Sequence, residues 1–137
     1  MAETVRLVEY YSVDVPDKPG AALQVLEQLY AAGVYLLAFS GLPKGRRAQL
    51  DFAPANTPAF RAAARKAGWK VSGPCKGFLI CGEDRVGVVG ELLEKLAAAK
   101  INVTRTQATI AGADRFGMIL WVKPGDVRRA AKALGAS

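Results

Sequence analysis

The chain contains one internal repeat, and this repeat limits the possible folds more than any other feature of the sequence. A displacement of 67 positions aligns residues 13–20 with 80–87 and residues 25–29 with 92–96, without a gap. The identical residues are Asp17, Gly20, Leu26, Glu27, Leu29, Ala31 and Ala32, which recur as Asp84, Gly87, Leu93, Glu94, Leu96, Ala98 and Ala99. Two copies of one supersecondary unit explain such a repeat. The sequence therefore predicts two domains, 1–73 and 74–137.

Both copies begin with the same two patterns of apolar residues. Apolar and polar residues alternate along 5–15, and again around 78–80, which predicts a strand at the start of each copy. A stripe with the spacing i, i+3, i+4, i+7 follows at 22–29 and 89–96, as is typical of an amphipathic helix. Each helix follows an Asp-x-x-Gly turn, and Gly33 has the position of a glycine that ends the first helix.

A hairpin and a second helix complete each copy. The expected hairpin strands are 34–39 with 48–52 and 101–110 with 116–122, with turns at 41–45 and 112–114, and the expected second helices are 58–67 and 126–134. The first copy adds a last strand at 69–72. The order β-α-β-β-α-β predicts an α+β protein of two tandem ferredoxin-like units, whose antiparallel sheets carry helices on one face. The second copy has no evident fourth strand, so its sheet is either three-stranded or completed by another segment, such as the long N-terminal strand.

The composition of the 137-residue chain is that of a soluble globular protein, since 51% of the residues are apolar and 23% are charged. No apolar run approaches the roughly 20 residues that span a bilayer, and the first residues lack the layout of a signal peptide. We therefore expect a cytoplasmic protein without a membrane partner. The net charge of +7 affects solubility and the electrostatic attraction of partners, but by itself it does not indicate a function.

The residue types argue against catalysis and against a metal site. The chain has no histidine, which is the commonest general base and the commonest neutral metal ligand. Cys75 and Cys81 lie six positions apart in a strand-like stretch, so they face the same side without forming a disulfide. Neither a P-loop nor a GxGxxG motif is present. We expect no catalytic residue, no metal and no cofactor.

The repeated unit resembles an ACT domain. The resemblance rests on the Asp-x-x-Gly turn after the first strand, the leucine-rich helix and the Lys-Ile-Asn-Val sequence at 100–103, and it extends from about Val5 to Gly135. The chain thus resembles the stand-alone, amino-acid-binding regulatory proteins built from tandem ACT domains. This resemblance implies a non-catalytic sensor that holds an amino acid between the loop after the first strand of one unit and the second strand of a neighbouring unit. A regulated enzyme would be its partner.

The residues of this implied site suit a zwitterionic ligand. Gly20 and Gly87 allow the backbone to approach a ligand closely, and the N–H groups at a helix N-terminus attract a carboxylate. Asn102 offers a donor and an acceptor at the position where ACT sensors usually carry asparagine, whereas the first copy has Tyr35 there. One competent site and one altered site is therefore plausible. The predicted ligand-binding residues are Asp17, Pro19, Gly20, Tyr35, Asp84, Val86, Gly87, Val88 and Asn102.

Each of these features also has a purely structural interpretation. The glycines suit a tight turn whether or not a ligand binds, and a helix-capping role is the better interpretation of Asp17 and Asp84. The cations of the second helices favour a solvated outer face over a binding surface; they are Arg61, Arg65, Lys66, Lys70, Lys123, Arg128, Arg129 and Lys132. Aromatic residues on the strands suggest that a second copy of the chain covers the sheet face opposite the helices, giving a homodimer; they are Tyr10, Tyr11, Tyr35, Phe39 and Trp121.

An RNA-binding module of RRM-like topology is the alternative, because it shares the β-α-β-β-α-β order. The stretch Arg115-Phe-Gly-Met-Ile-Leu-Trp121 approaches the motif of the third RRM strand. It lacks the glycine after the arginine and has Met118 in place of an aromatic residue. Nucleic acid is therefore the less favoured partner.

Overall fold

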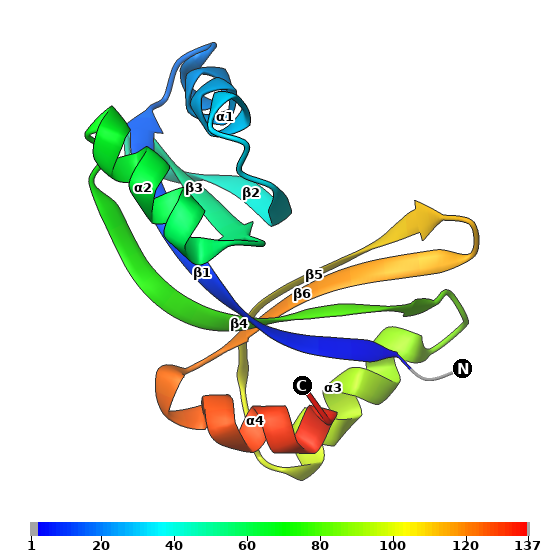
Figure 1. Cartoon of the computed structure of the whole chain (residues 1–137). Helices are drawn as coiled ribbons and strands as arrows, with labels where there is room; N and C mark the ends of the chain where they lie inside the picture. The colour runs from blue at the N-terminus through cyan, green and yellow to red at the C-terminus, as the bar shows by residue number, and fades with distance from the viewer. Residues whose placement is uncertain (1–2, 137) are drawn as a thin grey trace. The chain divides into compact units, whose positions relative to one another are not determined.

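The computed structural model describes residues 3–136, which form an α+β fold with four α-helices and six strands (Figure 1). The six strands make one sheet with the order β2-β3-β1-β4-β6-β5. The described chain divides into two compact units, of which one is Glu9–Cys75 and the other combines 3–8 with 76–136. None of the helices in this part of the chain combines the length and the apolar composition of a bilayer-spanning helix.

The unit Glu9–Cys75 carries two helices and uses parts of two long strands. Its elements are β1 (Thr4–Pro16, from Glu9 onward), α1 (Ala21–Ala31), β2 (Leu36–Lys44), β3 (Arg47–Pro54), α2 (Thr57–Ala67) and the first residues of β4 (Val71–Glu83). β3 pairs antiparallel with both β1 and β2. Gly33 follows the C-cap of α1 with a φ of 71°, which confirms that it ends this helix.

An aromatic cluster forms the centre of the core in this unit. Phe60 of α2 stacks on Tyr11 of β1, with ring centroids 5.1 Å apart, and lies 5.6 Å from Phe52 of β3. Asn56 fixes the start of α2, because its side-chain oxygen accepts a hydrogen bond from the N–H of Ala59 at 3.0 Å. The helix thus places its aromatic residue against the sheet.

The second unit contains the last two α-helices and the last two strands, together with the end of β4 and the N-terminal part of β1. Its elements after β1 are the end of β4, α3 (Val88–Ala98), β5 (Val103–Gly112), β6 (Arg115–Val122), a short 3-10 helix (Pro124–Asp126) and α4 (Val127–Leu134). β6 pairs antiparallel with β4 and β5. Val5 of β1 is buried in the same core as Phe78 and Leu96. The N-terminal strand is therefore the segment that completes the second sheet, which was one of the two expected solutions.

The structure corrects two expected boundaries. Residues 69–72 and 78–80 were predicted as separate strands, but they are joined in β4, in which Gly73 has a φ of 112°. A Cβ at Gly73 would lie 2.7 Å from the carbonyl oxygen of Tyr10, so the backbones of β4 and β1 approach closely there. The strand continues through the Gly73-Pro74 pair. The predicted turn at 41–45 is confined to Gly45 and Arg46, because Gly41 lies within β2 opposite Leu50.

Candidate functional site

The two Asp-x-x-Gly turns have the same backbone geometry. Gly20 is the N-cap of α1 with a φ of 85°, and Gly87 is the N-cap of α3 with a φ of 87°. In each turn the glycine carbonyl accepts the first helical hydrogen bond, from Gln24 and from Glu91, both at 3.0 Å. A Cβ at either glycine would meet no atom within 4 Å. The left-handed conformation, and not crowding, is the reason for glycine at these positions.

The predicted capping role of Asp17 and Asp84 is wrong. Because each N-cap is a glycine, no N-cap side chain accepts a hydrogen bond from the first turn of α1 or α3. Both aspartates are exposed and lie three residues before the N-cap, and no hydrogen bond of either carboxylate is found within residues 3–136. The N–H groups at these two helix starts therefore have no capping side chain.

A pocket of about 360 Å³ lies beside the first of these turns. It is formed by the end of β1, the first half of α1 and the segment that precedes β4. Its lining residues are Val13, Asp14, Val15, Pro16, Lys18, Ala21, Gln24, Val25, Gln28, Gly68, Trp69 and Lys70. We call it the loop pocket. It brings Lys18 of the Asp-x-x-Gly turn together with one carboxylate, a second ammonium and two amides.

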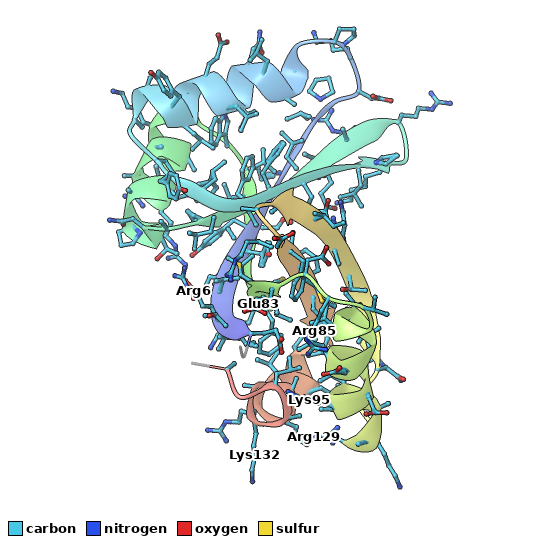
Figure 2. The ribbon with its side chains drawn as sticks, turned by 90° about the vertical axis from the view of Figure 1, so that its right-hand side faces the viewer. Arg6, Glu83, Arg85, Lys95, Arg129 and Lys132 are labelled. Atoms are coloured by element: carbon cyan, nitrogen blue, oxygen red, sulfur yellow. The ribbon has the colours of Figure 1, made fainter. Side chains whose placement is uncertain are left out.

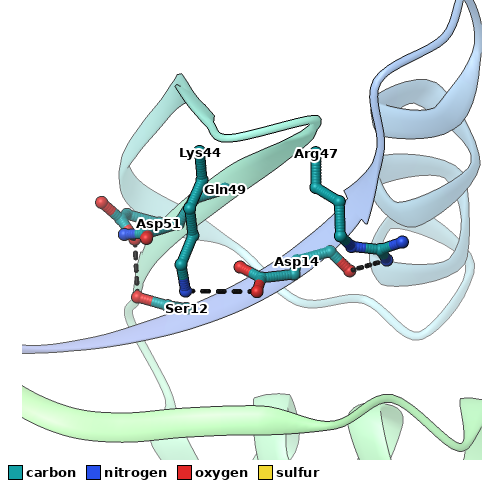
Figure 3. Close-up of polar contacts among 6 residues, drawn as sticks. All are labelled: Ser12, Asp14, Lys44, Arg47, Gln49 and Asp51. Atoms are coloured by element: carbon teal, nitrogen blue, oxygen red, sulfur yellow. Dashed lines mark hydrogen bonds and ion pairs between the residues drawn. The ribbon is translucent and has the colours of Figure 1, made fainter.

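The carboxylate of the loop pocket is held from a neighbouring hairpin. Lys44 Nζ lies 3.2 Å from Asp14 Oδ2, and an Arg47 terminal nitrogen donates to the Asp14 carbonyl oxygen at 3.4 Å (Figure 3). Lys18 and Lys70, in contrast, have no carboxylate within 4.0 Å among the described residues. The pocket thus contains two cations that are free to meet an anion.

A buried carboxylate on β3 was not predicted from the sequence. Asp51 is only 4% exposed and accepts hydrogen bonds from Ser12 Oγ at 2.6 Å and from Gln49 Nε2 at 2.8 Å (Figure 3). The alternation of Leu50, Asp51 and Phe52 indicates a residue on the solvent side of a strand. Its burial depends on the fold and leaves no signal in the sequence.

The second turn is occupied by an ion pair. Arg85, which is labelled in Figure 2, donates to both carboxylate oxygens of Glu91, at 2.5 and 2.8 Å, and approaches Glu3 Oε2 at 3.5 Å. The hydrogen bonds from Arg85 are the largest cause that holds the pKa of Glu91 below its ordinary value, and Glu91 in turn raises the pKa of Arg85. Beside them, Val86 is fully exposed and Val88 is buried in the core.

The two halves of the predicted site lie at opposite ends of each unit. In the second unit Glu83 pairs with Arg115, whereas Val103 pairs with Val122. These two positions of β6 are seven residue steps apart, which corresponds to about 23 Å along a strand. The turn 84–87 and Asn102 therefore do not meet within that unit.

The same separation occurs in the unit Glu9–Cys75, where Pro16 pairs with Arg47 and Leu36 with Pro54. Tyr35 is thus far from the turn at 17–20, and its side chain is 73% exposed. Asn102 is exposed as well. Neither unit by itself brings its first loop and its second strand together.

The aromatic residues expected of an RRM are not available for base stacking. Phe116 is 4% exposed and lies in the core of the second unit with Met118 and Leu120. Trp121 is covered by Arg105, whose guanidinium carbon is 4.6 Å from a ring centroid of the tryptophan. The stretch 115–121 therefore lacks the exposed aromatic pair that RNA-binding strands use.

No family model and no curated protein matches the sequence. Solved structures match nearly the whole chain. Protein BT0572 from Bacteroides thetaiotaomicron superposes with a TM-score of 0.82, at 14% identity, over 96% of this chain and 88% of that one. The ligand-free regulatory subunit of aspartate kinase from Thermus thermophilus has a TM-score of 0.62 at 18% identity, over 96% and 94%. The corresponding subunit from Thermus flavus has a TM-score of 0.59 at 16% identity, over 98% and 94%.

Identities this low establish a shared fold and not a shared ligand. The fold extends over 96% of the chain and matches the regulatory subunits over most of their own length. This likeness of fold agrees with the resemblance found in the repeated Asp-x-x-Gly units. In its fold, the chain is similar to these regulatory subunits of aspartate kinase.

Proposed function

We propose that this protein is a non-catalytic regulatory protein of two tandem ACT units that binds a free amino acid. The observation that carries the proposal is the loop pocket, because it adjoins the Asp-x-x-Gly turn that the sequence singled out. The similarity in fold to regulatory subunits of aspartate kinase supports a regulatory role. We further propose that the protein acts as a homodimer and that a regulated enzyme is its partner.

The chemistry of the loop pocket suits a zwitterion. Lys18 and Lys70 supply positive charge for a carboxylate, and the Asp14 carboxylate supplies negative charge for an ammonium group. Gln24 and Gln28 add donors and acceptors from α1. A volume of about 360 Å³ is within the range of small-molecule sites and leaves room for a side chain of moderate size.

Two of the predicted ligand-binding residues, Tyr35 and Asn102, lie at the second strands and do not line the loop pocket. Asn102 and Tyr35 lie far from the turn of their own unit, so they would contribute to a site only across two units. We propose that Asp84, Val86, Gly87 and Val88 form the loop side of such a site, and that Asp17, Pro19 and Gly20 do so in the other unit. Asn102 provides its strongest polar group.

A thermal-shift screen against the twenty amino acids tests the proposal. A ligand that binds only the folded protein increases the free energy of unfolding, by about 2.7 kcal/mol at a ligand concentration of a hundred times Kd. The melting temperature rises as a consequence. We expect one amino acid or a small related group to raise it. Lys18→Gln should abolish the shift, whereas Lys66→Gln, which removes an exposed lysine outside the loop pocket, should leave it unchanged.

The variants also separate the two proposed locations. Loss of the shift in Asn102→Ala, with Lys18→Gln unaffected, would move the ligand from the loop pocket to the site across two units. No shift with any amino acid, together with a salt-sensitive shift caused by a short single-stranded RNA, would contradict the proposal and support the RNA-binding alternative.

A further inference from the structure

A second pocket in the unit Glu9–Cys75 shares no residue with the loop pocket and includes none of the predicted site residues. It has a volume of about 250 Å³ and lies between α2, β1 and the start of β4. Its lining residues are Tyr11, Phe60, Arg61, Ala64, Arg65, Val71 and Gly73. We call it the arginine pocket, because two of its residues are arginines of α2.

Tyr11 fixes the position of the first arginine. Arg61 Nε donates to the Tyr11 hydroxyl at 3.1 Å, and the guanidinium carbon lies 5.4 Å from the centroid of the same ring. The hydroxyl is itself oriented, since it donates to Glu9 Oε1 at 3.5 Å. Tyr11 is almost fully buried, so it is a rigid support. The two terminal nitrogens of Arg61 keep their donors, because no acceptor for them is found within residues 3–136.

Arg65 lies one helical turn further along the same face of α2. Side chains at i and i+4 are neighbours, and two like charges at this spacing repel each other. Neither guanidinium has a carboxylate within 4.0 Å in the part of the chain that the structure describes. Two adjacent arginines without an acidic partner beside a pocket form an arrangement that an anion would stabilise.

The remaining walls of the arginine pocket are apolar. Phe60 and Ala64 are buried residues of α2, and Val71 is a partly buried residue of β4. A fully hydrated inorganic ion would gain nothing from these walls, whereas the hydrocarbon part of an organic anion would be removed from water. The small volume limits that part to a few carbon atoms.

We propose that the arginine pocket binds a small organic anion. Its carboxylate or phosphate group lies between the guanidinium groups of Arg61 and Arg65, and its short hydrocarbon part lies against Phe60, Ala64 and Val71. This site goes beyond the proposed amino-acid sensor, because it uses different residues and needs no ammonium-binding group.

The test is a titration of the whole chain with butyrate and, separately, with ethyl phosphate. NMR signals of the arginine Nε–H groups are recorded at each step, and sodium chloride keeps the ionic strength constant. We expect saturable shifts of Arg61 and Arg65 with at least one probe, and the stronger probe identifies the anionic group. Arg65→Gln should weaken binding by about tenfold or more, since it removes charge-assisted hydrogen bonds. Arg61→Lys, which keeps the charge but loses the planar fork, should also weaken it.

Arg46→Gln is the matched control, because it removes an arginine from the exposed hairpin turn of the same unit and should change the affinity less than twofold. If Arg61→Lys fails to fold, Arg65→Gln still tests the proposal, because no hydrogen bond or ion pair of the Arg65 side chain is found within residues 3–136 and its backbone hydrogen bond with Gly68 is kept. The absence of a saturable shift with both probes overturns the proposal, as does equal weakening by Arg46→Gln and Arg65→Gln. An amino-acid shift that survives in Arg65→Gln shows that the loop pocket is a separate site.

Discussion

The ion pair between Arg85 and Glu91 can be tested at the scale of single residues. The hydrogen bonds from Arg85 are the largest cause of the lowered pKa of Glu91, and the charge of Lys95 is a smaller one. NMR titration of the Glu91 carboxyl group should give a pKa below the ordinary value of about 4.3. Arg85→Gln should raise this pKa clearly, and Lys95→Gln should raise it less. A larger rise in Lys95→Gln would contradict the assignment.

The sign of the accompanying change in stability follows from the lowered pKa. A carboxyl group whose pKa is lower in the folded state stabilises the fold above its ordinary pKa of about 4.3, and this stabilisation is lost as the pH falls through the lowered value. Arg85→Gln should therefore reduce the free energy of unfolding at neutral pH and leave it unchanged in strong acid. The pair is exposed to solvent, so the reduction is small.

Helix α3 allows one substitution to be compared at two positions of the same element. Gly87→Ala places a side chain on a residue with a φ of 87° and should destabilise the protein by about 1–2 kcal/mol. Gly90→Ala, inside the helix and with open space around it, should stabilise the protein by about 0.5–1 kcal/mol. Urea unfolding of both variants measures the two signs. Equal effects would show that the turn before α3 does not require the left-handed conformation.

The sequence was most informative about elements whose residues interact locally. The apolar stripes at 22–29 and 89–96 predicted α1 and α3, and the Asp-x-x-Gly turns predicted where they begin, because spacing and turn geometry are local properties. The aspartates were assigned to the caps because their type is typical there, but the glycines three residues later take that position.

The parts of the candidate site that were not predicted depend on residues far apart in the chain. The loop pocket joins Lys18 to Lys70, and the arginine pocket joins Tyr11 to Arg61 and Arg65. The type and spacing of Arg61, Arg65 and Lys70 favoured a solvated outer face over a binding surface. Only the packing of α2 and β4 against β1 distinguishes a solvated face from the wall of a pocket.

At the scale of the whole molecule, β1 contributes to both cores, which the sequence left as one of two alternatives and did not place within the strand. The alternation along 5–15 is continuous, so the sequence contains no sign of a boundary within it. The predicted domain 1–73 assigns the entire strand to the first unit. In the structure, Val5 is buried in one core and Val13 in the other. We propose that the boundary lies inside β1, between Val8 and Glu9.

Native-state hydrogen exchange of two matched variants tests this boundary. Val5→Ala and Val13→Ala each remove two methyl groups from a buried position on β1, and each should cost about 2 kcal/mol. Since the cores are separate, Val5→Ala should accelerate amide exchange mainly within 76–136, and Val13→Ala mainly within 9–75. Val86→Ala, at a fully exposed position, should alter exchange in neither region.

If both core variants accelerate exchange equally in the two regions, the chain unfolds as one cooperative body and the division at β1 has no energetic meaning. If Val5→Ala acts mainly on 9–75, the domain boundary predicted from the sequence is the better one.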